Sequence, residues 1–267
     1  MTRVETITSA ANPLLKDVRR AIARGSLTSQ GWCVAETFHL LEEALRSDRE
    51  VRAVLAAESV RDTAEAHVRR LEGVKVAVLP DALFRSVSGT ESAQGVMALV
   101  QPPEWKLEQL FSGCPLVVVL DGLQDPGNAG TIARAAEAFG ASGMLFLKGT
   151  VNPWNPKVLR ASAGSLFRLP FLHGVESGAA RAAFEENKVP LFAGVPANGR
   201  GMKTPAEIDL GGRCGLIVGS EGHGVSGALR AAALDVSIPT VGVESLNAAV
   251  AAGILLYEAH RQRMPRQ

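Results

Sequence analysis

Three short polar segments, each placed after an apolar run, contain the side chains best suited to chemistry. The segments are LQDPGNAGTIAR, VGSEGHG and IPTVGVESLN. They supply amide, guanidinium, carboxylate and hydroxyl groups from Asn128, Arg134, Glu221, Ser245 and Asn247. Ligands of open α/β sheets bind beyond the carboxyl ends of the strands, so side chains in such loops are well placed to meet a ligand. We therefore expect the loop that contains Asn128, which follows the first strand of the second part of the chain, to carry chemistry.

Several enzyme classes are disfavoured by the same segments. LDGLQDPGNAGTI does not match GxGxxG, and the sequence has no GxxxxGK[ST], which argues against dinucleotide and P-loop sites. Ser220 and His223 are close in sequence, but the GxSxG elbow of a hydrolase is absent. The three cysteines are far apart, without CxxC or metal-ligand spacing, so we expect no metal site and a reducing compartment.

Each segment also has a purely structural interpretation. Arg134 by itself is compatible with a surface arginine near a helix start. The glycines around Glu221 permit positive φ, and a carboxylate is favoured beside a helix N-terminus, as in an ordinary capping turn. The individual segments therefore leave both interpretations open.

An alternation of strands, turns and helices must position the three segments. PLVVVLDG has the near-continuous apolar character of a buried parallel strand, and GLIVGSEGHGVS predicts a strand followed by a glycine turn. The third segment is expected to contain a strand end at Val236 and Ile238, a stop at Pro239, and a helix opening at or near Ser245. The helix body, AAVAAG, would let another backbone approach closely.

Length and composition set the broad class. The chain has 267 residues, enough for one large domain or two ordinary ones. A hydrophobic content of 46% and a charged content of 21% are typical of a soluble globular protein. No apolar run approaches the roughly 20 residues of a membrane span, and the first residues lack a signal-peptide core, so we expect a cytoplasmic protein without membrane contact. The net charge of +1 argues neither for nor against binding of nucleic acid.

The first part of the chain, from Val4 to about Val100, is predicted to be an α/β unit with a parallel or mixed sheet. A boundary follows between Pro102 and Gly113, where prolines interrupt the pattern. NPLLKDVRRAIAR has helical spacing with several basic residues on its polar side. This basic run predicts either a solvated helix face or a contact with an RNA backbone.

Together, NAGTIAR, VGSEGHG and IPTVGVESLN resemble, in this order, the three motifs of the SpoU/TrmH family of RNA ribose 2′-O-methyltransferases, of the SPOUT superfamily. The likeness covers about Leu116 to Arg261. It implies an α/β protein whose C-terminal SPOUT domain, residues 113–267, has a parallel sheet and a deep trefoil knot. SAANPLLKDVRRA, GWCVAE and SAQGVMALV more loosely resemble the family's smaller L30e-like RNA substrate-binding domain, residues 1–101, before a linker at 102–112.

The resemblance implies S-adenosyl-L-methionine as cofactor, bound bent in the knot. By transfer from the family, the cofactor-binding residues are Val195, Val218, Gly219, Ile238 and Leu246. Arg134 resembles the catalytic arginine; its high pKa makes it a poor base, so we expect it to position the ribose or phosphate and to stabilise negative charge on oxygen. Asn128, Glu221, Ser245 and Asn247 would fix the arginine, the loops and the ribose.

Two departures from the family pattern stand out. SLNAAVA replaces the frequent SLNVSVA and removes one hydroxyl, and Thr37 follows Glu36 where the family typically has glycine. The expected activity is 2′-O-methylation of RNA, with 23S rRNA preferred over tRNA; some family members confer antibiotic resistance in this way. A non-catalytic RNA-binding ribosome assembly factor is the alternative from another class.

The family also works as homodimers through the C-terminal domain. The last helix, from about Leu246 to Gln262, is apolar on more than one side around Val250, Ile254, Leu255, Leu256 and Tyr257. Such a helix must bury more than one side, against its own sheet and either a second subunit or the first domain.

Overall fold

The computed structural model describes residues 3–69, 71, 73–90, 93–196 and 202–264. The chain forms two compact units, one of Met1–Glu104 with Trp154–Arg168 and one of Trp105–Pro153 with Leu169–Gln267. The segment Trp154–Arg168, called the arm below, therefore packs with the first unit, whereas the predicted boundaries assigned it by sequence to the second domain. Within the described ranges, no helix is long and apolar enough to cross a membrane.

The first unit contains a five-stranded mixed sheet in the order β1-β4-β3-β5-β2. Its strands are β1 (Arg3–Thr6), β2 (Cys33–Glu36), β3 (Val51–Ala57), β4 (Lys75–Leu79) and β5 (Val96–Val100). Strands β1, β4 and β3 are parallel, and β5 is antiparallel to β3 and β2. Its helices are α1 (Pro13–Arg24), α2 (Phe38–Arg46), η1 (Glu58–Val60), α3 (Arg61–Val68) and α4 (Asp81–Val87).

Helix α1 shows why the basic run is helical. The Asn12 side chain accepts the Leu14 N–H at 2.9 Å, and Pro13 occupies the first helical position, where its missing N–H costs nothing. The helix buries Leu15, Val18 and Ala21 and ends at Gly25, whose φ of 59° suits a glycine C-cap. The polar side, which carries the basic residues, therefore faces away from the core.

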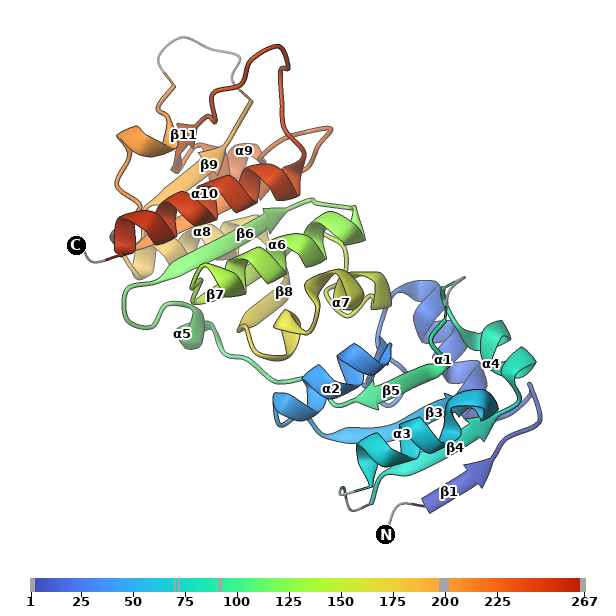
Figure 1. Ribbon diagram of the computed structural model, residues 1–267. Helices are drawn as coiled ribbons and strands as arrows, with labels where there is room; N and C mark the ends of the chain where they lie inside the picture. The colour runs from blue at the N-terminus through green and yellow to red at the C-terminus, as the bar shows by residue number, and fades with distance from the viewer. Residues whose placement is uncertain (1–2, 70, 72, 91–92, 197–201, 265–267) are drawn as a thin grey trace. The chain divides into compact units, whose positions relative to one another are not determined.

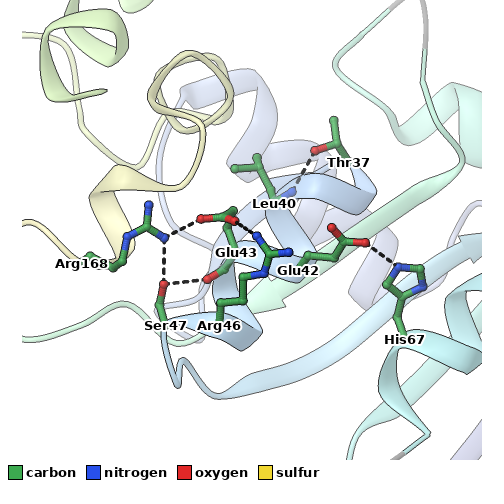
Figure 2. A network of polar contacts seen from close by, with 8 residues as sticks. All are labelled: Thr37, Leu40, Glu42, Glu43, Arg46, Ser47, His67 and Arg168. Atoms are coloured by element: carbon green, nitrogen blue, oxygen red, sulfur yellow. Dashed lines mark hydrogen bonds and ion pairs between the residues drawn. The ribbon is translucent and has the colours of Figure 1, made fainter. Parts of the chain in front are cut away.

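Thr37 occupies a backbone conformation that favours glycine. Its φ is 131°, in a region that side chains with a β-carbon rarely adopt. The Thr37 hydroxyl accepts the Leu40 N–H at 3.1 Å and so caps helix α2, as Figure 2 shows. The departure from the family's glycine thus exchanges backbone freedom for a side-chain cap.

The arm is fixed to the first unit by buried charges. It contains α7 (Pro156–Ser162) and η2 (Ser165–Phe167). Glu36, which is 4% exposed, accepts a hydrogen bond from the Gly89 N–H at 2.8 Å and forms an ion pair with Arg160 of α7. Glu43 on α2 is likewise buried and pairs with Arg168 at 2.6 Å (Figure 2). Removing one partner of such a buried pair leaves an uncompensated charge, so the arm is held firmly.

The second unit is built on a six-stranded sheet in the order β11-β9-β10-β6-β7-β8, and all of its pairings are parallel, as predicted. Its strands are β6 (Leu116–Asp121), β7 (Gly143–Leu147), β8 (Phe171–Val175), β9 (Leu191–Gly194), β10 (Cys214–Gly219) and β11 (Ala233–Val236). Its helices are α5 (Leu107–Leu110), α6 (Pro126–Ala138), α8 (Ser177–Glu186), η3 (Pro205–Glu207), α9 (Gly227–Arg230) and α10 (Ala248–Arg263).

Helices cover the sheet of the second unit. Helices α6 and α10 lie side by side (Figure 1), and the ring of Phe139, directly after α6, lies 5.9 Å from the ring of Tyr257 on α10, measured between ring centroids. Buried residues of α5, α8 and α9, including Leu110, Phe184 and Leu229, form one core cluster with residues of the sheet. The helix-covered parallel sheet agrees with the expected α/β class; the deep trefoil knot stays a prediction.

Two boundaries in the third polar segment differ from the sequence expectation. Strand β11 ends at Val236, so Ile238 lies in the following loop and not at the strand end. Helix α10 begins at Ala248, three residues after Ser245. The reason is the cap: the Asn247 side chain, not that of Ser245, accepts the N–H groups of Ala249 at 2.9 Å and Val250 at 3.2 Å.

Candidate active site

A cavity of about 400 Å³ lies where three neighbouring strands of the second unit end. It is lined by residues that follow β9, by the loop after β10, by the loop after β11, and by the first turns of α10. All of these strands are parallel, so their carboxyl ends lie at the same edge of the sheet. This is the edge at which open α/β sheets bind ligands, and the volume suits a small molecule.

All five residues predicted to hold a cofactor line this cavity: Val195, Val218, Gly219, Ile238 and Leu246. Glu221 and Ser245 line it as well. The other three candidates, Asn128, Arg134 and Asn247, are not among the lining residues. The residues transferred from the family therefore lie around one cavity, while Asn128, Arg134 and Asn247 lie outside its lining.

The backbone at Gly219 leaves no room for a side chain. A β-carbon added there would lie 2.5 Å from the backbone nitrogen of Val225 and closer still to the carbonyl group of Gly224. The loop is closed on itself, because Ser220 and Gly224 exchange backbone hydrogen bonds of 3.1 and 2.8 Å. Glycine at this position thus permits a tight turn at the wall of the cavity.

Small residues of α10 form another wall. Ala248, Ala251 and Ala252 line the cavity together with Leu255. Sequence reasoning noted the AAVAAG run and interpreted it as allowing close backbone approach. In the structure these short side chains also leave space for a ligand, a role for which the run of alanines was the available signal.

A chain of side-chain hydrogen bonds connects the three polar segments. The Asn247 amide donates to Oδ1 of Asn128 at 3.0 Å, and the Asn128 amide donates to Oε1 of Glu221 at 2.7 Å. Because Oδ1 of Asn247 already accepts two helix N–H groups, its NH₂ group must face Asn128, which in turn directs the Asn128 NH₂ group to the carboxylate. The helix cap therefore sets the direction of the whole chain.

Two further ties around the cavity were not predicted from the sequence. Asp121, buried at the end of β6, accepts the Ser226 N–H at 2.7 Å and so anchors the end of the loop after β10. Arg230 lines the cavity and forms an ion pair with Asp235 at 2.6 Å. Asp121 and Ser226 are 105 residues apart, so spacing along the sequence gives no sign of their contact.

Arg134 lies apart from these groups on the same helix as Asn128. Its side chain is exposed on α6. Six residues along an α-helix correspond to about 9 Å of rise and a rotation of about 120° from Asn128. Within the described part of this chain, Arg134 is thus outside both the cavity lining and the Asn247–Asn128–Glu221 chain.

The cysteines do not offer a nucleophile for this site. Burial raises the pKa of Cys214 to about 11 and that of Cys33 to about 12, so both thiols stay protonated near neutral pH. Cys114 is exposed but is not among the cavity residues. No cluster of potential metal ligands occurs in the portion of the chain that the structure describes.

Comparisons with known proteins agree with this geometry. Residues 115–257 match the model of the SpoU rRNA Methylase family, and residues 12–98 match an MRM3-like substrate binding domain. The chain is 33% identical to the Bacillus subtilis 23S rRNA (guanosine(2553)-2′-O)-methyltransferase RlmP, over 95% of this chain and 98% of that protein.

Two solved structures are similar over nearly the whole chain. One is the SpoU methyltransferase AviRb from Streptomyces viridochromogenes in complex with AdoMet, with 28% identity, a TM-score of 0.82, and coverage of 94% of this chain and 99% of that one. The other is an AdoMet-bound rRNA methyltransferase from Sinorhizobium meliloti, with 26% identity, a TM-score of 0.81, and coverage of 98% and 99%. The loops, the cavity and these matches lead to one conclusion: the chain belongs to the SpoU rRNA methylase family.

Proposed function

We propose that this protein methylates a ribose 2′-hydroxyl of 23S rRNA, using S-adenosylmethionine as methyl donor. The observation that carries the proposal is the cavity at the strand ends, which contains all five expected cofactor-binding residues. Relatives named as 23S rRNA 2′-O-methyltransferases, RlmP and a Streptomyces viridochromogenes enzyme that is 33% identical, support the choice of rRNA. Such a substrate would place the enzyme in the cytoplasm.

The residues of the cavity fit S-adenosylmethionine. Val218, Ile238 and Leu246 offer apolar surface, while Gly219 and the alanines of α10 allow the ligand to approach the backbone. When bound, this cofactor supplies the methyl group. The contribution of the protein is to hold the ribose in line with that group and to exclude competing orientations.

The polar groups beside the cavity divide this work. The hydrogen bonds from Asn247 to Asn128 and from Asn128 to Glu221 fix the Glu221 carboxylate. This carboxylate can accept hydrogen bonds from the ribose hydroxyl groups and so orient the ribose. Ser245 lines the cavity, and its hydroxyl group can rotate to donate or to accept a hydrogen bond. The Arg134 guanidinium offers several N–H donors and no acceptor, so it serves to position the RNA and to stabilise negative charge on the reacting oxygen.

The test is methyl transfer from labelled S-adenosylmethionine to unmodified RNA. We expect label on a ribose of 23S rRNA, mapped by resistance of the methylated nucleotide to alkaline cleavage. Label found only on bases would contradict 2′-O-methylation, and label found only on tRNA would contradict rRNA as the substrate. Absence of cofactor binding by calorimetry would favour the non-catalytic assembly factor.

We further propose that the protein is a homodimer through the second unit. Val250, Ile254 and Tyr257 are exposed by 52, 38 and 53%. They follow an i, i+4, i+7 spacing and therefore form one apolar stripe on α10. A self-complementary stripe suits a twofold interface. The position of Arg134 outside the cavity of its own chain is consistent with a composite site in which the arginine serves the partner.

Replacing Ile254 by glutamate is expected to convert the dimer to a monomer, because it places two charges in an apolar interface. Light scattering on the full-length protein should show the mass falling by half. Leu234→Glu is the matched control, since Leu234 on β11 is similarly exposed, at 42%. A wild-type protein that is already monomeric at micromolar concentration would show that this interface is wrong.

A second substitution tests the hydrogen-bond chain. Asn247→Asp keeps an acceptor for the helix cap but loses the donor to Asn128, so Asn128 would turn its oxygen toward Glu221. Hydrogen bonds to charged groups contribute about 1.5–3 kcal/mol, which corresponds to a rate loss of about 10- to 160-fold if Glu221 is misplaced. The turnover rate and the melting temperature should be measured together. An unchanged rate at an unchanged melting temperature would show that the hydrogen bond from Asn247 to Asn128 has no part in the reaction.

A further inference from the structure

Helix α1 carries a row of exposed positive charges. Lys16, Arg20 and Arg24 are spaced four residues apart, so they lie along one side of the helix at intervals of about 6 Å. All three are exposed, and in the described portion of the chain they have no ion pair or side-chain hydrogen bond. Successive phosphates of a nucleic acid strand are separated by a similar distance.

The neighbouring charged groups on α1 are already engaged elsewhere. Arg19 donates to the carbonyl of Ala10 at 3.1 Å and to the hydroxyl of Ser86 at 2.9 Å. Asp17 accepts both the N–H and the hydroxyl of Ser29. The one carboxylate of the helix is thus directed to Ser29, and the row of three cations remains available.

Several other cations of the first unit are paired, whereas Arg69 and Arg85 are exposed without an ion pair among the described residues and are not part of a row. Arg52 contacts Glu50 at 2.5 Å, Arg61 contacts Glu65 at 2.7 Å, and Lys75 contacts Glu5 at 2.6 Å. Each of these pairs cancels its own charge locally. Against this pattern, the row of three cations on α1 forms a local concentration of positive charge that the net charge of the chain conceals.

The arm extends this row beyond the end of α1. A β-carbon added at Gly25 would lie 3.0 Å from Cγ of Asn155, so the arm packs directly against the C-terminus of the helix. Asn155 caps α7, and Lys157, two residues later, is exposed. Arg160, one turn further on, holds the arm in place through Glu36. Lys157 is therefore fixed near the Arg24 end of the row.

We propose that Lys16, Arg20, Arg24 and Lys157 form one surface that binds the phosphodiester backbone of the RNA substrate. This inference rests on the proposed function and identifies where the RNA is held outside the cavity. Charge complementarity supports a polyanion, since phosphate contacts by lysine and arginine dominate affinity for nucleic acids. In the described residues of the first unit, Val4 is the only large apolar side chain that is exposed, so this face lacks the apolar surface that insertion into a membrane requires.

Because Lys157 belongs to the arm, the proposed surface combines residues from two distant parts of the sequence. Its two ends continue into the methyltransferase sequence at Pro153 and Leu169. An RNA backbone held across α1 and Lys157 is thus bound by residues from both parts of the sequence. None of the four residues lines the cofactor cavity, so removing the surface should affect RNA binding and not S-adenosylmethionine binding.

The experiment compares the wild type with a Lys16→Ala/Arg20→Ala/Arg24→Ala variant and with Lys157→Ala. Binding of a labelled fragment of unmodified 23S rRNA is measured by fluorescence anisotropy over a range of salt concentrations. Removing one cation that neutralises a phosphate should reduce the slope of log K against log salt by roughly 0.7–0.9. We therefore expect a decrease of about 2–3 for the triple variant and just under one for Lys157→Ala, with KM for RNA raised at least about tenfold in the triple variant.

A matched control removes the same number of charges from paired positions. Arg52→Ala/Arg61→Ala/Lys75→Ala changes the net charge equally and should keep the wild-type salt slope. The triple variant should also keep the wild-type circular dichroism spectrum, S-adenosylmethionine affinity and turnover at saturating RNA.

The outcomes separate this inference from the proposed function. One outcome is that the wild type methylates rRNA while the triple variant binds RNA with an unchanged salt slope and KM. In that case the proposed RNA-binding surface is wrong, and the proposed methyltransferase function is still supported. If Lys157→Ala alone leaves the slope unchanged, the arm has no part in the surface. If the wild type neither methylates RNA nor binds S-adenosylmethionine, the proposed function fails, whatever the variants do.

Discussion

Replacing Arg134 by alanine should reduce methyl transfer by about 100- to 1000-fold, the usual cost of removing one group that stabilises a developing oxyanion. Binding of S-adenosylmethionine should stay at the wild-type level, because Arg134 is exposed on α6 and is not part of the cavity lining. Initial rates with labelled methyl donor and calorimetry with S-adenosylmethionine measure the two properties separately.

Arg134→Lys is the informative control. It keeps the positive charge but loses the planar fork of donors that can hold two oxygen atoms at once. Activity between the wild type and the alanine variant would indicate that charge and geometry both contribute. Turnover of the alanine variant close to that of the wild type would contradict the role of Arg134 in transfer.

If the composite site is correct, Arg134 has a further property. An inactive Arg134→Ala chain should regain activity when it is mixed with a chain inactivated by a substitution in its cofactor cavity. The reason is that a mixed dimer contains one complete site. The expected recovery is at most half of the wild-type rate per mixed dimer. Absence of recovery, with mixed dimers demonstrated by mass spectrometry, would show that each chain uses its own arginine.

Replacing Gly219 by alanine should strongly weaken binding of S-adenosylmethionine. The new methyl group would overlap with the Gly224 carbonyl and the Val225 nitrogen, and both are backbone atoms that cannot rotate away. The Ser220–Gly224 turn would have to open, which changes the wall of the cavity. Calorimetry should show at least about a hundredfold loss of affinity, in keeping with the few kcal/mol that overpacking and backbone shifts cost.

The same loop contains its own control. Gly222 also lines the cavity, but a β-carbon added there meets no atom within 4 Å. Gly222→Ala should therefore bind the cofactor far better than Gly219→Ala. Equal affinities of the two variants and the wild type would show that the turn is not part of the cofactor site.

Local sequence signals were enough to predict most strands and helices of the second unit, whereas the cavity residues were indicated by the resemblance to the family's motifs. Continuous apolar runs such as PLVVVLDG predicted buried parallel strands, and β6 occupies that run in an all-parallel sheet. Glycines, prolines and cap residues predicted turns at the strand ends, and those turns surround the cavity. These features are encoded by neighbouring residues, so spacing and residue type are sufficient to find them.

The boundary of α10 shows where local signals were ambiguous. Both Ser245 and Asn247 are good helix caps, and their sequence context does not choose between them. In the structure Asn247 caps the helix while its NH₂ group bonds Asn128, from a segment 119 residues earlier in the chain. That distant partner favours Asn247, and only the folded sheet brings the two residues together.

The roles of the arm and of the charged residues became visible only in the folded chain. By sequence, Trp154–Arg168 continues the methyltransferase region, yet its arginines meet Glu36 and Glu43, more than 120 residues away. The pattern of α1 could not separate free cations from bonded ones either, since Arg19 is engaged by Ser86 and Arg20 is not. Ion pairs and hydrogen bonds between distant segments depend on three-dimensional proximity, which periodicity along the chain does not encode.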